Sequence, residues 1–367
     1  MADATPPPDA LAMDMVLAGW RSQALVAFVK TGIADAMKYG VYNDPKTLAD
    51  KCKLNADAVN RLLRFLSTVN VCIEEEITGG TYKLGVIGEV CSRSHPQSVT
   101  GAILLEGSKQ HVSCWTNLSE FLKTGEKVMK ITHGVNDYWD MCKADSSHLK
   151  IFQAGMGGYS KGEAAMIEMD QLSPTLDMSK LGIICDIGGG EGTLLQVLAQ
   201  RFPKNSYILA ELTEVVKNMD GTSFPSNIKL SATDFFKKET IPKANAYILK
   251  HILHDWDDVS SIKILENIKA VNPEAKVFIL EFGPMPGPNI PHLSKLFDLH
   301  MAILLSGSER SQEEYNALYA KSGYKLTTTH LLAAGNHPLY IQEIDPLYIQ
   351  EIDPLYIQEI EPGQLWC

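Results

Sequence analysis

The chain has 367 residues, a formal net charge of −11, and 45% hydrophobic and 21% charged residues. The acidic excess disfavours binding to nucleic acid or to an anionic membrane, because both are bound mainly through basic side chains. The sequence has no apolar run long enough to cross a bilayer, and residues 1–15 lack the features of a secretory signal. The seven cysteines are scattered without a CxxC pair, which favours reduced thiols in a cytoplasmic protein.

The first hundred residues predict a helical, winged-helix part. Residues 13–38, 47–52 and 56–70 have the apolar spacing of helices, and two strand-like runs follow around the Gly79-Gly80 pair. This order is typical of a helix-turn-helix followed by a wing. The helix 56–70 offers only two arginines, and "CIEEEI" places three glutamates on the wing. Packing against a partner protomer, or a role as a lid, is therefore favoured over contact with DNA.

The rest of the chain changes pattern once. Residues 101–172 are mostly helical in their spacing. From about residue 180, short β-branched runs alternate with helical stretches, and glycines follow the strands. This alternation predicts the α/β class, with a doubly wound, Rossmann-like sheet.

The end of the chain repeats itself. "PLYIQEID" occupies residues 338–345 and again 346–353, and "PLYIQEIE" follows at 354–361. One copy alternates apolar and polar residues, so we expect it to form a final antiparallel strand. We expect the surplus copies to hang off the end as an acidic tail, and strand addition to a partner is the alternative.

The stretch "DIGGGEG", Asp186–Gly192, follows an apolar strand, opens a helix and spaces its glycines as G-x-G-x-G. A dinucleotide fingerprint would instead read G-x-G-x-x-G, around a pyrophosphate. The tighter spacing and the preceding acid favour S-adenosylmethionine, which has no phosphate. Gly188 would let the backbone approach the amino-acid end of this ligand, and Asp186 would attract its ammonium group through water.

Two acids follow at the ends of the next two predicted strands. Glu211 lies 21 residues after Gly190, where a carboxylate can accept both ribose hydroxyls. Asp234 and Phe235 can offer an acceptor to the adenine amino group and an apolar face to its ring. A glycine loop with two acids at the ends of successive strands is a more specific pattern than the loop alone.

The stretch "HILHDWDD", residues 251–258, follows the fourth predicted strand and should lie at the mouth of the cofactor cleft. A metal site needs several convergent ligands, and no cysteine or further histidine cluster supplies them, so we expect no metal. A polar loop without a function is the other alternative, which the position after a strand disfavours.

The chain resembles the small-molecule O-methyltransferases that use S-adenosylmethionine, such as the plant caffeate and flavonoid enzymes and the animal acetylserotonin enzyme. The resemblance covers roughly residues 15–345 and is carried by "DIGGGEGTLLQVLAQRFP", "LKHILHDWDD", "ILEFGPMPG" and "GSERSQEEYNALYAKSGY". It implies a helical and winged-helix dimerisation domain at 1–100, a connector contributing to the acceptor pocket at 101–172 and a methyltransferase domain at 173–345, which leaves 346–367 as the repeated acidic tail. The repeats themselves are not a feature of the family.

The same resemblance implies roles for individual residues. His254 would be the general base, flanked by Glu281 and Glu309, and His251 would be structural. The implied cofactor contacts are Gly188, Glu211, Asp234, Phe235, Lys250 and Ser160, and the implied acceptor contacts are Phe152 and Met156. Glu211 replaces the family's more usual aspartate, and its extra methylene can loosen the hold on the ribose. Ordinary core packing is the alternative for the two acceptor contacts.

These residues suit methyl transfer to oxygen. A phenol has a pKa near ~10, so a base must take its proton at neutral pH, and a histidine with a pKa near ~6.5 is suited to this. A carboxylate on the other ring nitrogen fixes the tautomer. We therefore expect methylation of a hydroxyl of a small aromatic molecule. The helix predicted over 13–38 has too little charge for an exposed helix, so we also expect a homodimer in which it packs on a partner. The alternatives are methylation of nitrogen, sulfur or carbon, a non-methylating relative, and a winged-helix regulator that senses a small molecule.

Overall fold

The computed structural model describes residues 6–77, 79–168, 177–305, 307–331 and 339–347, without the side chains of 164–168. The chain divides into a helical unit, 1–119 with 139–162, and a sheet unit, 120–138 with 163–367. The expected connector 101–172 falls partly in each unit, and the expected domain boundaries stay predictions. Among the described helices, none combines the length and the hydropathy that a membrane span needs.

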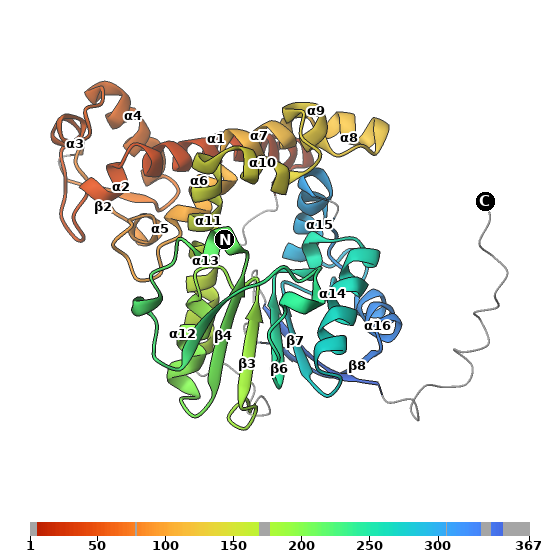
Figure 1. Cartoon of the computed structure of the whole chain (residues 1–367). Coiled ribbons are helices and arrows are strands. Elements are labelled where there is room, and N and C mark those ends of the chain that lie inside the picture. The colour runs from red at the N-terminus through yellow and green to blue at the C-terminus, as the bar shows by residue number, and fades with distance from the viewer. Residues whose placement is uncertain (1–5, 78, 169–176, 306, 332–338, 348–367) are drawn as a thin grey trace. The chain divides into compact units, whose positions relative to one another are not determined.

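The helical unit is made of helices, of which α1 and α11 are the longest, and one small hairpin (Figure 1). Its elements are α1 (Pro8–Lys30), α2 (Ile33–Ala36), α3 (Pro45–Cys52), α4 (Ala56–Ser67), β1 (Cys72–Glu74), β2 (Tyr82–Leu84), α5 (Val86–Val90), α6 (Thr100–Glu106), α7 (Lys109–Thr116), α10 (Tyr138–Ala144) and most of α11 (Ser146–Glu168). The helices α3 and α4 and the antiparallel β1–β2 hairpin follow one another in the predicted order.

Local signals set the limits of these two helices. Asp44 and Asn55 begin α3 and α4 by accepting the backbone N–H groups three residues ahead, at 2.9 and 3.0 Å. Lys53 ends α3 in the left-handed conformation, with φ 58°. The buried side chains of Leu48 and Leu63 then pack the two helices into one core.

The first long helix differs from its prediction. The helix predicted over 13–38 begins earlier, at Pro8, and ends at Lys30, because Gly32 takes a φ of 80° and starts the separate helix α2. Glycine reaches this conformation without strain, whereas other residues do not. Phe28 is buried at the end of α1, while Trp20 is 73% exposed. The first half of α1 thus presents apolar side chains that its own unit does not cover.

The sheet unit is built on seven strands in the order β5-β4-β3-β6-β7-β9-β8. The strands are β3 (Ile183–Ile187), β4 (Ser206–Glu211), β5 (Ile228–Ala232), β6 (Ala246–Lys250), β7 (Lys276–Glu281), β8 (Tyr324–Leu331) and β9 (Tyr340–Pro346). Strands β3 to β7 are parallel, and β9 runs antiparallel to both of its neighbours. The α/β class is confirmed, and the sheet is mixed because its last strand runs backwards.

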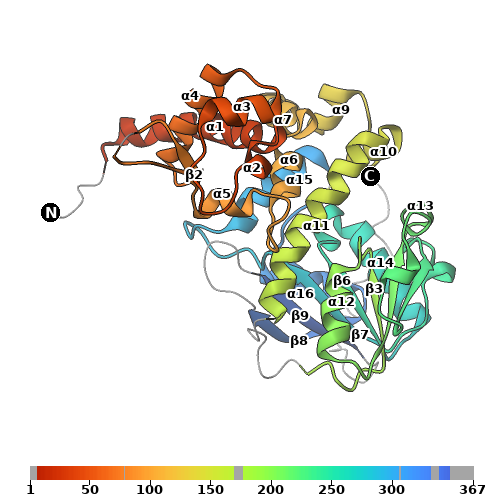
Figure 2. The ribbon, with the colours of Figure 1, turned by 90° about the vertical axis from the view of Figure 1, so that its left-hand side faces the viewer.

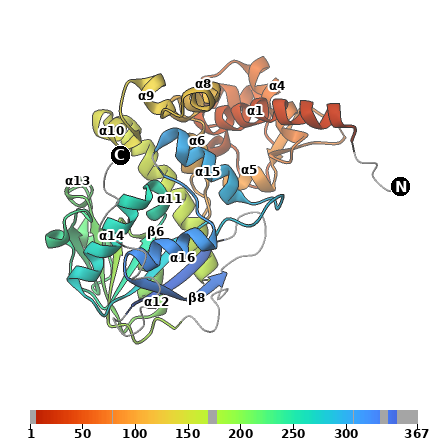
Figure 3. The same cartoon turned by 90° about the vertical axis from the view of Figure 1, so that its right-hand side faces the viewer.

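Helices cover both faces of this sheet. The helices that lie wholly or mostly in the sheet unit are α8 (Leu118–Thr124), α9 (Val128–His133), α12 (Thr193–Arg201), α13 (Thr213–Val216), α14 (Asp258–Val271), α15 (Leu293–Leu304) and α16 (Gln312–Lys321), with 3₁₀ turns η1 (Gly221–Ser223), η2 (Lys238–Thr240) and η3 (Leu253–Asp255). Leucines of α12 pack on one face, and apolar side chains of α14 and α16 pack on the other. Figures 2 and 3 show α12 and the pair α14 and α16 on these opposite faces.

The first repeat supplies β9. This strand lies between β7 and β8, so it is an inner strand of the sheet and not an edge. Ile341 and Ile344 are buried in the two different cores, one on each face. The expected acidic tail lies outside the described residues, apart from Pro346 and Leu347.

Candidate active site

The strand order reverses between β3 and β6. The chain leaves β3 toward β4 on one side, and it leaves β6 toward β7 on the other. In open α/β sheets, ligands bind beyond the carboxyl ends of the strands at such a point. Ile187 pairs with Leu249 at these ends, so the glycine stretch after β3 and the histidine stretch after β6 are neighbours.

The glycine loop runs against the turn that follows β6. A Cβ atom on Gly188 would lie 2.6 Å from Cδ1 of Ile252, and the φ of 70° would by itself strain any other residue there. Gly190 also has a positive φ, 57°, but no described atom lies within 4 Å of where its Cβ would be. The main chain is therefore open to close approach by a ligand at Gly190.

Asp186, at the end of β3, is fully buried, and neither carboxylate oxygen has a hydrogen-bond partner among the described residues. Burial raises the pKa of this carboxyl to about 7, with Lys250 lowering it and Glu211 raising it. A buried acceptor without a donor costs free energy. Asp186 therefore fits a ligand that brings a cationic group or a hydrogen-bond donor to the loop.

Glu211 ends β4 and holds the glycine loop. Its Oε1 accepts the N–H of Gly190 at 3.2 Å, and its Oε2 accepts the N–H of Leu212 at 2.7 Å. Burial raises the pKa of Glu211, although these two backbone donors lower it. Each carboxylate oxygen can accept a second hydrogen bond, so both remain able to receive hydroxyl groups of a ligand.

Asp234 and Phe235 follow β5 and lie next to the histidine turn. The carboxylate of Asp234 accepts the N–H of Phe236 at 3.1 Å and pairs with Lys237 at 2.8 Å. The hydrogen bond from Lys237 lowers the pKa of Asp234. The ring of Phe235 meets that of Trp256 edge to face, with centroids 5.9 Å apart. The structure thus brings the third strand end and the "HILHDWDD" turn together.

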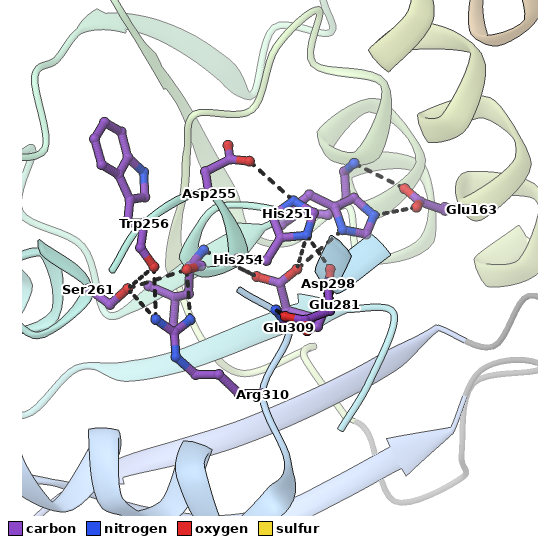
Figure 4. Close-up of polar contacts among 12 residues, drawn as sticks. Glu163, His251, His254, Asp255, Trp256, Ser261, Glu281, Asp298, Glu309 and Arg310 are labelled. Carbon is purple, nitrogen blue, oxygen red and sulfur yellow. Dashed lines mark hydrogen bonds and ion pairs between the residues drawn. The ribbon is translucent and has the colours of Figure 1, made fainter. Parts of the chain in front are cut away.

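His254 lies buried in η3, in contact with several carboxylates (Figure 4). Its Nδ1 is 2.8 Å from Oε1 of Glu309 and 3.6 Å from Oε2 of Glu281. Glu281 also accepts the backbone N–H groups of Leu253 and His254, at 3.1 and 3.4 Å. Nδ1 is thus the nitrogen that donates to a carboxylate, which leaves Nε2, 3.5 Å from Oδ1 of Asp255, to exchange a proton.

These carboxylates change the acidity of His254. Burial lowers the pKa of the imidazole, but Glu281, Glu309 and Asp255 outweigh it and raise the pKa to about 10. The pKa of His254 therefore lies above the ordinary histidine value near 6.5 that its sequence position alone suggests. The ring is a stronger base than free imidazole, and a smaller fraction of it is neutral at pH 7.

The segment that contains Gly307 and Arg310 fixes the turn that carries His254. Arg310 is 2% exposed and donates to the carbonyls of Leu253 and Trp256, both at 2.8 Å. A Cβ on Gly307 would lie 1.9 Å from the carbonyl oxygen of His254, so the backbone of this segment passes directly against the turn. The segment that supplies Glu309 therefore also fixes the backbone of the histidine turn.

His251 has a more specific environment than the structural role expected for it. Its Nε2 is 2.5 Å from Oε1 of Glu163, and its Nδ1 is 3.3 Å from Oε2 of Glu281. The other oxygen of Glu163 pairs with Nζ of Lys250 at 3.0 Å. His251 and His254 stack with ring centroids 5.2 Å apart. Lys250, expected at the cofactor, is thus engaged by Glu163.

His251, His254 and Glu281 offer ligand atoms that all lie within 4.8 Å of one another, which is close enough for a metal ion. The hydrogen-bond geometry favours another interpretation, because both nitrogens of His251 and Nδ1 of His254 already face carboxylates. The expected absence of a metal stays a prediction.

The three site residues predicted on α11 lie in the other unit. Phe152, Met156 and Ser160 are each partly buried within the helical unit. The ring of Phe152 meets Trp139 edge to face, at a centroid separation of 5.4 Å. Their predicted roles at the acceptor and the cofactor stay predictions.

Sequence reasoning missed two residues, Glu163 and Arg310. Glu163 lies three positions after Ser160, and an acid at that spacing on a helix shares a face with the earlier residue. Arg310 directly follows Glu309, in a segment already singled out. Neither signal says that these side chains are buried, which depends on tertiary packing.

Known proteins resemble this chain over most of its length. A family model described as the O-methyltransferase domain matches residues 115–325. The mitomycin biosynthesis 6-O-methyltransferase of Streptomyces lavendulae is 28% identical, over 90% of this chain and 93% of its own. The phenazine O-methyltransferase PhzM of Lysobacter antibioticus is also 28% identical, over 90% and 94%. The crystal structure of LaPhzM superposes with a TM-score of 0.83 at 27% identity, covering 93% of this chain and all of the other.

The fold and these comparisons define the class of the protein as a methyltransferase. The chain belongs to the O-methyltransferase domain family, whose model spans more than half of it, and the resemblance noted in the sequence is confirmed. The protein is therefore an O-methyltransferase.

Proposed function

We propose that the protein transfers the methyl group of S-adenosylmethionine to a hydroxyl of a small aromatic molecule, with His254 as general base. The observation that carries this proposal is the 2.8 Å contact between Nδ1 of His254 and Glu309, at the carboxyl end of the sheet. A base held in one tautomer at this place can take a hydroxyl proton on Nε2 as the C–O bond forms. Glu309 and Glu281 stabilise the resulting imidazolium.

The cofactor assignment is supported by three observations. S-adenosylmethionine supplies an electrophilic methyl group on a sulfonium, next to an amino acid and a ribose. Asp186, without a partner among the described residues, would attract the ammonium group, and Gly190 leaves the main chain open. Glu211 would accept the ribose hydroxyls, while Asp234 and Phe235 would receive the adenine. No metal takes part in this proposal, so dialysis against a chelator should leave activity unchanged.

The acceptor class is inferred from relatives. The names of two relatives specify mitomycin biosynthesis and a phenazine, both small-molecule settings. Phe152 and Met156 would pack the acceptor ring, and Ser160 and Lys250 would contact the cofactor. The alternative is methylation of a nitrogen, sulfur or carbon atom, and the buried base favours a hydroxyl instead. Cys52, Cys72, Cys91 and Cys185 are free thiols, in keeping with the expected cytoplasmic location.

The test is a screen of phenols, indoles and aliphatic alcohols with a labelled methyl donor, repeated on the best acceptor with His254→Gln. Glutamine keeps much of the shape but cannot carry a proton at neutral pH. Turnover should fall by about 10²–10⁴-fold, the usual effect of a positioned base. The matched control is His95→Gln, at a partly exposed histidine of the helical unit. Equal turnover in the two variants would refute the role of His254.

A further inference from the structure

A second imidazole, that of His251, stacks on the ring of the proposed base His254. His251 directly follows β6, and its side chain is 9% exposed. Two carboxylates approach its two ring nitrogens, Glu163 at Nε2 and Glu281 at Nδ1 (Figure 4). Glu281 in turn contacts both the ring and the backbone N–H of His254. A continuous chain of polar contacts therefore leads from Glu163 to His254.

The backbone at His251 is unusual. Its φ is 53°, in the left-handed region that side-chain-bearing residues seldom enter. Such a conformation costs free energy and persists only when the surroundings enforce it. Here it accompanies a buried imidazole between two acids, a placement that simple packing of the turn would not require.

We propose that His251 is a positioning residue for methyl transfer: Glu163 keeps it a doubly hydrogen-bonded imidazolium that orients Glu281 and limits how strongly His254 holds its proton. This inference rests on the proposed role of His254 as the base. Glu163 touches neither His254 nor any reacting atom of that proposal. Under this inference it affects the reaction through His251.

The charges around both rings fix the direction of this effect. His251 is faced by Glu163, Glu281 and the neighbouring Asp255, which favour its charged form. Lys250 and the stacked His254 oppose that charge. Burial lowers the pKa of His251, but the two carboxylates at its ring nitrogens outweigh burial and raise it.

His254 is faced by Glu281, Glu309 and Asp255, which all favour its protonated form. A cationic His251 offsets Glu281 and repels a second positive charge at the stacked ring, 5.2 Å away. Without Glu163, His251 becomes neutral and that offset disappears. The pKa of His254 then rises, and less of the base is neutral at a given pH.

The experiment measures kcat against pH, at saturating donor and acceptor, for the full chain and four variants. Glu163→Gln removes the charge, and His251→Asn removes the imidazole while tolerating the positive φ. The third variant combines both changes. The control is Glu274→Gln, at an exposed acid just before β7 and thus at the opposite edge of the sheet from His251.

Each single variant should move the rising limb of the profile to higher pH by about one unit, which is roughly a tenfold loss at a fixed pH on that limb. The double variant should match His251→Asn alone, because Glu163 acts through His251. Imidazole ¹⁵N spectra of the unaltered protein should show His251 protonated at pH 7, a result that does not depend on any variant folding.

Three results would overturn the inference: a neutral His251 at pH 7 in the unaltered protein, a Glu163→Gln profile that superposes on that of Glu274→Gln, or additive single effects. Failure of the proposed function is separate, because it would show as retained turnover in His254→Gln. A structural role alone would lower stability or kcat at every pH without moving the limb.

Discussion

At the scale of single residues, the acidity of His254 is set by its neighbours. Burial alone would make this imidazole a weaker base, but three carboxylates reverse the sign and raise its pKa to about 10. The proposed reaction uses the neutral ring, whose fraction grows as pH rises toward that value. The carboxylates thus make His254 a stronger base, but they also lower the fraction of the ring that is neutral and able to accept a proton at pH 7.

We predict that kcat rises with pH from about 6 to 9 for an acceptor that stays un-ionised over that range. The rise reflects deprotonation of His254, whose pKa lies well above its usual value. Steady-state rates with saturating donor measure it, and His254→Gln should abolish the slope. A flat profile in the unaltered protein, or the same slope in the variant, would contradict the assignment.

Glu211 gives a second prediction at this scale. Glu211→Ala should weaken binding of S-adenosylhomocysteine by about 1–3 kcal/mol, because the ribose hydroxyls lose their acceptor. The N–H of Gly190 also loses its partner, so the loop should become less ordered. Calorimetry measures the affinity, and NAD should not bind either protein. If NAD bound and S-adenosylhomocysteine did not, the cofactor assignment would be wrong.

At the scale of elements, the last strand is defined by a sequence that occurs three times. The first copy forms β9, which is inserted between β7 and β8. The described contacts extend one residue past the strand, where the N–H of Leu347 donates to the carbonyl of Gly323 at 2.8 Å. A cut that spares the sheet must therefore fall after Leu347.

We predict that removing residues 348–367 leaves the free energy of unfolding and the activity nearly unchanged, since one copy suffices for β9. Urea unfolding and the methylation assay measure both quantities. A truncated protein that is insoluble or inactive would show that the surplus copies belong to the fold.

The repeat also predicts that a second copy can replace a damaged first copy in β9. Ile344 is fully buried, so Ile344→Asp in the truncated chain should cost several kcal/mol. In the full chain the second copy can replace the first, and the connecting loop grows by eight residues. Doubling a loop costs only about 0.6 kcal/mol. Urea unfolding should therefore show a much smaller loss in the full chain, and equal losses would exclude the exchange.

At the scale of the whole molecule, α1 predicts assembly. Met15 and Trp20 on this helix are 80% and 73% exposed, a costly arrangement for two large apolar side chains. We predict a homodimer in which α1 packs on the partner protomer. Light scattering at micromolar concentration should give twice 40.5 kDa, and Trp20→Glu should weaken the association. A 40.5 kDa particle in the unaltered protein would refute the dimer.

Much of this protein follows from local sequence. The alternation of strands and helices determined the α/β class, because periodicity reports which faces of each element are buried. The acids at the ends of β4 and β5, and the histidine turn after β6, were placed by the rule that parallel strands end at one edge. His254, Glu281 and Glu309 were named together because their motifs resemble those of one family, and the structure brings them within contact distance.

Tertiary structure alone decided how these groups act. The raised pKa of His254 depends on the adjacent Asp255 and on Glu281 and Glu309 from two distant segments, whose distances no spacing in the sequence encodes. Glu163 and Arg310 looked like ordinary charged residues until packing buried them against the histidine turn. The role of a charge depends on its desolvation and on the charges that face it, and both are properties of the folded chain.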